Sequence, residues 1–241
     1  MKFVVVLWLF SSLMVFGAEQ VKNLEDIPSS GGTSGCSIPH WCWEHDKGTN
    51  GSSTGSSKIS GQLRRFDVVW KYYGGERFHV YFGAAHKDGQ STSFTLDTWI
   101  YFNSLANVNN IELDLNQVSV SGDTVIYGMQ CNFGKGMWQY VTNHSGHPHW
   151  NNSNVACSRK VWKGDAWHHV ILKYHRDSAG NVTYDSVTFD TKVSKFVGAS
   201  GPSVFGLGWG IGRQVVNFQI GGNKTNSGAT AFLKNLTVTG N

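Results

Sequence analysis

Charge, proline and cysteine are all scarce in this sequence, and each scarcity excludes a class of protein. Charged residues make up 15% of the chain, and only four of its 241 residues are proline, whereas 29 are glycine. Helical bundles are rich in Ala, Glu, Leu and Lys, so this composition argues against them. It favours short strands joined by Gly, Asn and Ser turns, because glycine then supplies the turn conformations that proline does not.

Basic clusters are missing as well. The formal net charge is +4, and no Lys/Arg run is longer than Arg64-Arg65. Proteins that bind nucleic acid concentrate basic residues on one face or along one helix, so the sequence gives no support for a nucleic-acid partner.

Long apolar runs are absent except at the start of the chain. A nearly unbroken apolar stretch, Phe3 to Phe16, follows a lysine and precedes the small residues Gly17-Ala18. This pattern is typical of an export signal, and the stretch is short for a membrane span. We therefore expect residues 1–18 to be a signal peptide, cleaved before Glu19. We expect the mature protein to be secreted and extracellular, with no membrane span.

The chain has only four cysteines, and they fit that compartment. There is no C-x-x-C motif, and export favours disulfides over zinc sites. Four cysteines allow three pairings, between which the sequence cannot choose. Local pairing is the simplest, so we predict that Cys36 is bonded to Cys42 and Cys131 to Cys157.

Residues 19–60 show little apolar periodicity. They contain the short motif CSIPHWCW, and Gly48–Gly61 (GTNGSSTGSSKISG) is rich in Gly, Ser and Thr. We predict an N-terminal Cys/Trp segment followed by a Gly/Ser-rich linker. Because the segment has too little apolar surface for a core, we expect it to be dispensable for folding, apart from any packing of Trp41 and Trp43. These tryptophans either form a flap that packs on the domain or an aromatic platform for sugar.

Residues 61–241 contain short runs in which apolar and polar residues alternate, separated by glycine-containing turns. We find no amphipathic helix, and the spacing of the runs predicts one domain with two packed antiparallel sheets. The predicted strands are Phe66–Tyr73, Phe78–Phe82, Ser93–Phe102, Asn110–Val118, Thr124–Cys131, Met137–Val141, Trp167–Arg176, Val182–Asp190, Val215–Ile220 and Ala231–Val238.

Three segments resemble strands of laminin-G-like and pentraxin-like jelly rolls: Ser93–Phe102 (SFTLDTWIYF), Trp167–Tyr174 (WHHVILKY) and Phe232–Val238 (FLKNLTV). The resemblance implies the concanavalin A-like lectin/glucanase fold, an all-β, two-sheet antiparallel jelly-roll sandwich. This fold carries lectins, adhesive modules, glycosidases and lyases, so it does not determine the function.

Two carboxylates alternate along one predicted strand. Glu112 and Asp114 point to the same face of that strand, while Leu113 and Leu115 point to the other. The stretch resembles the E-x-D-x-x-E signature of laminarinase-type retaining glycosidases. The resemblance implies that Glu112 is the nucleophile and Asp114 the carboxylate beside it.

Gln117 stands where the same resemblance places the acid/base. Glutamine cannot donate a proton as a carboxylic acid does. In a regular strand residue 117 also points away from residue 114, so convergence on one cleft requires a bulge near Leu115-Asn116.

Aromatic and amide side chains supply the second half of a sugar site. We expect Trp138, Tyr140 and Trp150 to stack on sugar rings, and Gln130 and Gln219 to hydrogen bond to hydroxyl groups. The alternative for each aromatic residue is a place in the sandwich core.

The sequence gives little indication of a bound metal or cofactor. His144, His147 and His149 could chelate a transition metal or form a solvated loop. We expect no cofactor, although structural calcium is an alternative because the fold often carries it.

The sequence leads to three hypotheses. The first is a secreted, monomeric protein that binds polysaccharide or glycan around Glu112, Asp114 and Gln117. The second is an enzyme, either an endo-acting retaining glycosidase for β-glucan or, with less support, a polysaccharide lyase. The third is an adhesive laminin-G-like module that binds protein.

Overall fold

Strands dominate the computed structural model, which describes residues 19–32, 39–82, 90–119, 121–207 and 213–241. In the described residues the only helical element is a single 3-10 turn, η1 (Leu24–Asp26), and no helix is long and apolar enough to cross a membrane. The expected all-β class is therefore confirmed. The predicted signal peptide and Cys36 lie outside the described residues.

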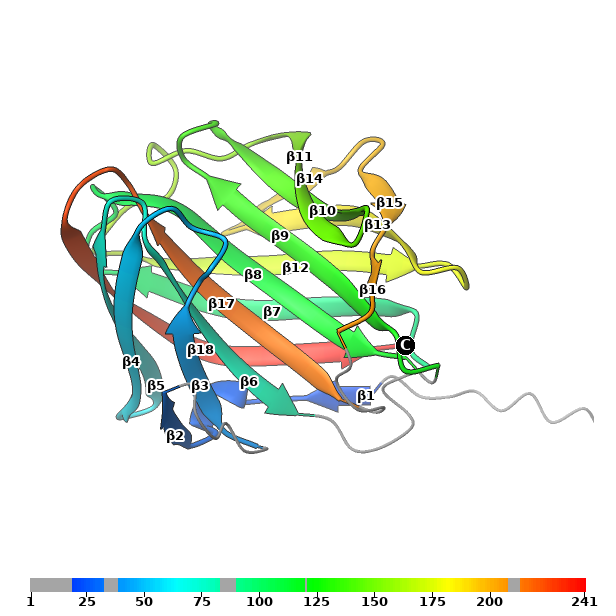
Figure 1. Cartoon of the computed structure of the whole chain (residues 1–241), viewed down its shortest axis with the longest axis horizontal. Coiled ribbons are helices and arrows are strands. Elements are labelled where there is room, and N and C mark those ends of the chain that lie inside the picture. The colour runs from blue at the N-terminus through cyan, green and yellow to red at the C-terminus, as the bar shows by residue number, and fades with distance from the viewer. Residues whose placement is uncertain (1–18, 33–38, 83–89, 120, 208–212) are drawn as a thin grey trace, which may run out of the picture.

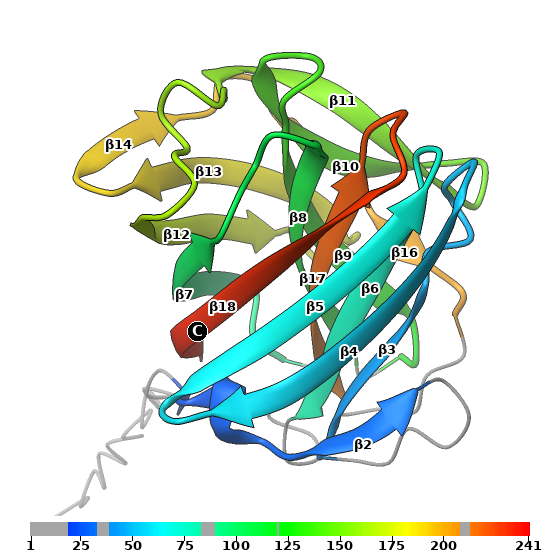
Figure 2. The ribbon, with the colours of Figure 1, turned by 90° about the vertical axis from the view of Figure 1, so that its left-hand side faces the viewer.

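Two large sheets form a sandwich. Sheet A is made of β14 (Lys192–Lys195), β13 (Asn181–Phe189), β12 (Trp167–Arg176), β7 (Ser93–Phe102), β18 (Ser227–Gly240), β5 (Leu63–Lys71) and β4 (Ser52–Ser60), in that order, with β1 (Glu19–Val21) beside β18 and β15 (Ser200–Pro202) beside β13. Figure 2 shows β18, β5 and β4 of this sheet from outside.

Sheet B is made of β11 (His147–Ala156), β10 (Met137–His144), β9 (Thr124–Asn132), β8 (Val108–Val118), β17 (Gln214–Gly222), β6 (Gly75–Phe82), β3 (Trp41–His45) and β2 (Ser29–Gly32), in that order, with β16 (Val204–Phe205) beside β9. All pairs described are antiparallel except β2 with β3. In Figure 1, β9, β8, β17 and β6 cross in front of β12, β7 and β18. This architecture confirms the expected two-sheet jelly-roll sandwich and agrees with the concanavalin A-like resemblance.

The core lies between the two sheets and is rich in aromatic rings. Phe66 of β5 contacts Phe78 and Phe218 of sheet B, with ring centroids 4.8 and 5.1 Å apart. Further along the sandwich, Phe94 of β7 contacts Tyr127 of β9 at 5.1 Å. Each of these side chains alternates with an outward-facing neighbour, which is the period that the sequence displays.

The prediction of a Gly/Ser-rich linker is wrong. Residues Ser52–Ser60 form β4, which pairs with β5 along its whole length, and Trp41–His45 form β3, which pairs with β6. A small side chain is needed at Gly55, because a Cβ there would lie 2.6 Å from the Cγ of Glu76. The Ser/Gly composition therefore reflects a crowded edge strand and not a flexible chain.

The N-terminal segment is also held by buried polar contacts. The Trp41 indole donates to the Leu24 carbonyl at 2.8 Å, and Arg64 Nε donates to the Glu25 carbonyl at 2.9 Å. The Glu25 carboxylate in turn accepts a hydrogen bond from the backbone N–H of Leu236, on β18, at 2.8 Å. Trp41, Leu24 and Arg64 are fully buried. The described residues 19–32 and 39–60 therefore belong to the sandwich itself.

A disulfide joins Cys131 on β9 to Cys157, just after β11, which confirms that predicted pair. Both cysteines lie in the hydrophobic core. The Cys36–Cys42 bond stays a prediction, because residue 36 is not among the described residues.

Candidate functional site

The outward face of sheet B carries the two carboxylates singled out in the sequence. Leu113 and Leu115 of β8 are buried in the core, so Glu112 and Asp114 point to the opposite side of the sheet. The pairing of β8 with β9 and β17 is regular from residue 110 to residue 117. This regular register determines which residues of the neighbouring strands share the face.

The same register places Gln117 on the opposite face of the sheet from the carboxylates. No bulge interrupts the middle of β8, so Gln117 points into the sandwich and is fully buried. Its amide oxygen accepts hydrogen bonds from the Tyr127 hydroxyl at 2.9 Å and from Arg176 Nε at 3.0 Å, and its Nε2 donates to the Ser91 carbonyl at 2.8 Å. The placement of Gln117 in the candidate cleft is therefore wrong, because the odd spacing from Asp114 reverses the face.

Polar side chains from seven neighbouring strands line up across the outward face, at positions that pair directly from strand to strand. We call this set the polar row, and from β11 to β3 it consists of Asn152, Gln139, Gln130, Glu112, Gln219, Arg77 and Glu44. The row thus includes the predicted residues Gln130 and Gln219.

Hydrogen bonds connect members of the polar row. Gln139 Nε2 donates to Asn152 Oδ1 at 2.8 Å, and Gln130 Nε2 donates to Gln139 Oε1 at 3.0 Å. Gln219 Nε2 donates to the Glu112 carboxylate, and Arg77 forms an ion pair with Glu44. These bonds fix the side chains in one arrangement without using all their polar atoms.

A second line of residues runs beside the polar row. Asp114 pairs with Gly128 on one side and with Asn217 on the other, and His79 follows Asn217 on β6. Glycine is required at 128, since a Cβ there would lie 2.9 Å from Asp114 Oδ1.

Several buried polar atoms on this face lack a hydrogen-bond partner. They are Asp114 Oδ1, Asn116 Oδ1, Gln219 Oε1 and His79 Nδ1. Most buried polar side-chain atoms in proteins are paired with protein or ordered water, so ordered water is the expected partner of these four atoms.

Burial dominates the electrostatics of the carboxylate pair. It raises the pKa of Glu112 well above its usual range, and the charge of Asp114 raises it further. Burial also raises the pKa of Asp114 to about 6, although hydrogen bonds from its neighbours oppose the shift.

These shifts predict that stability falls as pH rises from about 4 to about 6. An unfolded Asp has a pKa of about 3.9, so the folded state binds the Asp114 proton more tightly and loses that advantage on ionisation. The effect is on the order of 3 kcal/mol. Urea unfolding between pH 4 and pH 7 should show a smaller decrease for Asp114→Asn than for wild type. The exposed Asp123→Asn is the control, and an unchanged slope in Asp114→Asn would contradict the prediction.

The predicted aromatic residues divide between the two sides of sheet B. Trp138 is only 2% exposed and lies in the core near Trp162, at a centroid distance of 6.5 Å. Tyr140 packs inward against Tyr184 at 5.2 Å. A stacking role for Trp138 and Tyr140 is therefore wrong, because alternate residues of β10 face the core. Trp150 pairs with Val141 and lies on the outward side, half-buried.

The histidine-rich hairpin does not gather a metal site. The rings of His144 and His149 are 5.8 Å apart. Within the described ranges, no group of three or more His, Cys, Asp and Glu residues is arranged to hold a metal ion.

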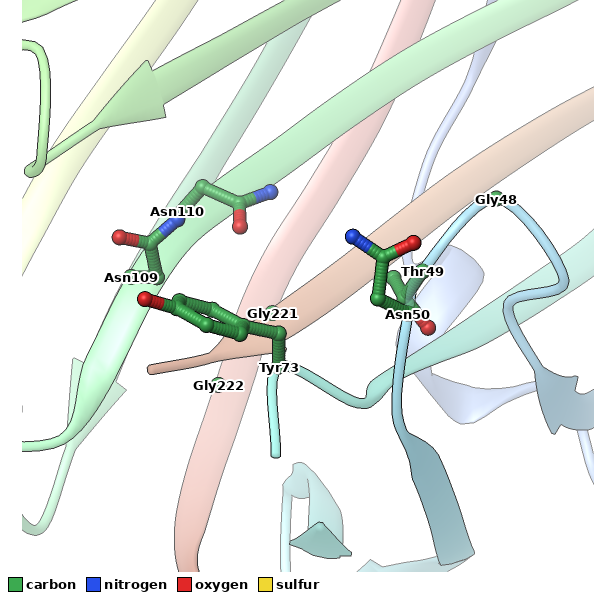
Figure 3. A pocket seen from close by; sticks show the side chains of 8 residues that line it. All are labelled: Gly48, Thr49, Asn50, Tyr73, Asn109, Asn110, Gly221 and Gly222. Carbon is green, nitrogen blue, oxygen red and sulfur yellow. The ribbon is translucent and has the colours of Figure 1, made fainter. Parts of the chain in front are cut away.

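A pocket of about 230 Å³ opens where β8 begins and β17 ends. We call it the rim pocket, and it is lined by Gly48, Thr49, Asn50, Tyr73, Asn109, Asn110, Gly221 and Gly222. Figure 3 shows the Tyr73 ring below the Asn110 amide, with the Asn50 amide on the other side of the pocket. The sequence analysis placed these positions in the predicted linker, at the ends of predicted strands and in turns. Only the clustering of Gly and Asn at the ends of separate strands could have pointed to a pocket.

Comparisons with known proteins give a likeness of fold only. No family model matches the chain, and no curated protein matches it. Among solved structures, arcelin-5, a lectin-like defense protein from Phaseolus vulgaris, is 12% identical with a TM-score of 0.48, over 83% of this chain and 98% of that chain. A legume lectin-like domain from Entamoeba histolytica is 9% identical with a TM-score of 0.47, over 78% and 88%. The carbohydrate-binding module CBM66 from Bacillus subtilis is 10% identical with a TM-score of 0.41, over 78% and 95%. At these identities the likeness concerns backbone architecture alone.

Proposed function

We propose that this protein binds a polysaccharide chain on the outward face of sheet B and does not hydrolyse it. The polar row carries this proposal. It crosses seven neighbouring strands, and four of its amides supply both donors and acceptors. Sugar hydroxyl groups also donate and accept, so an extended glycan laid along the row matches its chemistry.

Trp150 completes the proposed site. It lies on the outward side of β11, beside the exposed end of the polar row at Asn152. A half-buried indole offers an apolar surface on which the C–H face of a sugar ring can rest. The Cys131–Cys157 disulfide supports an exported protein, which would meet glycan outside the cell.

The raised pKa of Glu112 and the burial of Gln117 argue against hydrolysis. A retaining glycosidase needs an ionised nucleophile and a separate acid/base about 5–5.5 Å away, across the scissile bond. Here the pKa of Glu112 is raised by burial and by Asp114, which favours the protonated form. The residue at the expected acid/base position, Gln117, is in the core. We therefore infer binding without bond cleavage.

Affinity measurements with variants test this proposal. The wild-type protein should be retained on at least one of a panel of β-glucan, xylan, alginate and pectin, without release of reducing ends or unsaturated uronates. Trp150→Ala should weaken binding about tenfold, a loss of about 1.4 kcal/mol. Trp99→Ala is the matched control, because Trp99 is half-buried on the outer face of sheet A.

Two results would contradict the proposal. The first is that no polysaccharide of the panel retains the wild-type protein. The second is that Trp150→Ala and Trp99→Ala change the affinity equally, since the outward face of sheet B would then have no special role. Release of reducing ends by the wild type would show hydrolysis. It would contradict the inference that the protein does not cleave its ligand, but not the inference that it binds glycan.

A further inference from the structure

The loops around the rim pocket are held together by unusually close backbone contacts. A Cβ at Gly51 would lie 2.0 Å from the Lys71 carbonyl oxygen, and a Cβ at Gly74 would lie 2.0 Å from the Ser52 carbonyl oxygen. The turn between β3 and β4 and the turn between β5 and β6 therefore pack backbone against backbone. The N–H of Tyr73 adds a hydrogen bond to the Asn223 carbonyl at 3.0 Å. These contacts hold the turns that line the pocket against one another.

Two consecutive tyrosines in this turn have a left-handed backbone. Tyr72 has a φ of 46° and Tyr73 a φ of 62°. Bulky residues rarely adopt this conformation, and such strain is concentrated at functional sites. The turn leaves both rings in solvent, with Tyr72 52% and Tyr73 39% exposed, but only Tyr73 lines the pocket.

Several polar groups around the pocket are unengaged. Neither the Tyr73 hydroxyl nor the side-chain amides of Asn50 and Asn109 make a hydrogen bond within the described part of the chain. An exposed aromatic ring beside free amides is a surface that suits a polyhydroxylated ring, because the ring face covers C–H groups and the amides bond to hydroxyls.

The rim pocket is continuous with the polar row. Asn110, which lines the pocket, donates from Nδ2 to Gln130 Oε1 of the row at 2.8 Å. Asn110 and Glu112 lie on the same face of β8, about 7 Å apart along the strand. Glycine at 221 permits this arrangement, since a Cβ there would lie 2.1 Å from Asn110 Oδ1. A glycan on the polar row would therefore lie next to the pocket.

We infer that the rim pocket is a subsite for one pyranose ring of the bound glycan. Tyr73 is the stacking residue of this subsite, and Asn50 and Asn109 bind hydroxyl groups of that ring. This inference rests on the proposed function. It adds a subsite that determines specificity at one end of the same binding site.

Calorimetry with hexasaccharides tests the subsite. The probes are hexasaccharides prepared from the β-glucan, xylan, alginate and pectin of the panel. Tyr73→Ala should weaken binding of the hexasaccharide that the wild type binds by about tenfold. Tyr73→Phe, which keeps the ring, should bind almost as the wild type does. Tyr72→Ala tests the turn itself, because it removes the ring that packs against Tyr73, with centroids 5.3 Å apart, but no residue that lines the pocket.

A second readout reports on the amides. In the 15N-labelled wild-type protein, the side-chain amide resonances of Asn50 and Asn109 should shift when that hexasaccharide is added, and in Tyr73→Ala they should shift much less. Urea unfolding of each variant shows whether the fold is intact.

The outcomes separate this inference from the proposed function. If Tyr73→Ala binds as the wild type does while Trp150→Ala is weakened, the subsite is refuted and the proposed face remains. If Tyr73→Ala is weakened while Trp150→Ala is not, the rim pocket binds sugar by itself and the proposed face is refuted. If the wild type binds no glycan, both fail.

Discussion

A chain that begins at Gly61 should fail to fold and should aggregate. The truncation removes β1, η1, β2, β3 and β4, and with them the fully buried side chains of Trp41 and Leu24. Burial of each such side chain contributes about 1.5–3 kcal/mol, which is a large share of a typical stability of about 5–15 kcal/mol. The deletion also exposes the edges of β5 and β6, and unpaired strand edges promote aggregation.

Soluble yield, gel filtration and near-ultraviolet circular dichroism measure this result. A chain that begins at Glu19 is the control and should be soluble and folded. A single substitution in the chain that begins at Glu19 tests the same contacts without removing any strand. Trp41→Ala should lower the free energy of unfolding by about 3–5 kcal/mol, the cost of removing a large buried ring. A monomeric, cooperatively folding Gly61 chain would show that the N-terminal strands are accessory.

Removal of the Cys131–Cys157 disulfide should cost about 3 kcal/mol of stability. The bond closes a loop with a sequence separation of 26, and a loop of that length restricts the unfolded chain by about this free energy. The double variant Cys131→Ala/Cys157→Ala should therefore unfold at a clearly lower urea concentration than the wild type. Both positions are in the core, so alanine leaves no unpaired polar group.

The single variant Cys131→Ala is the control for side-chain volume. Its unfolding free energy should be as low as that of the double variant, because the bond is lost in both. Mass spectrometry of the unreduced wild-type protein should show a peptide pair joined through the two cysteines. Free thiols at these positions, or equal stability of wild type and double variant, would contradict the assignment.

Strands with a buried face could be predicted from the sequence, whereas polar edge strands could not. All ten predicted strands exist, because alternation of apolar and polar residues directly reflects one buried face. The missed strands include β4 and β11, which are the outermost strands at one edge of each sheet. Edge strands carry Ser, Asn and Lys to prevent further pairing, so their composition resembles that of a loop.

The candidate site was partly predictable for the same reason. The shared face of Glu112 and Asp114 follows from their spacing alone. Gln117 was misplaced because a family signature was carried over against the two-residue period of a strand. The direction of Trp138 depends on which alternate residues of β10 face the core, and flanking turns do not reveal this. The rim pocket joins loops far apart in the chain, so only the fold brings Tyr73 to Asn109.

The pairing of β1 with β18 determines how the molecule can be attached to something else. Glu19 lies opposite Gly240, so the two ends of the described chain are side by side. From there β18 runs back over its 14 residues, on the order of 45 Å, to the turn beside Gly222 at the rim pocket. A tether at either end would therefore attach the molecule beside one end of β18, while the rim pocket lies near the other end of that strand. Head-to-tail fusions could join copies through short spacers that do not start at the rim pocket.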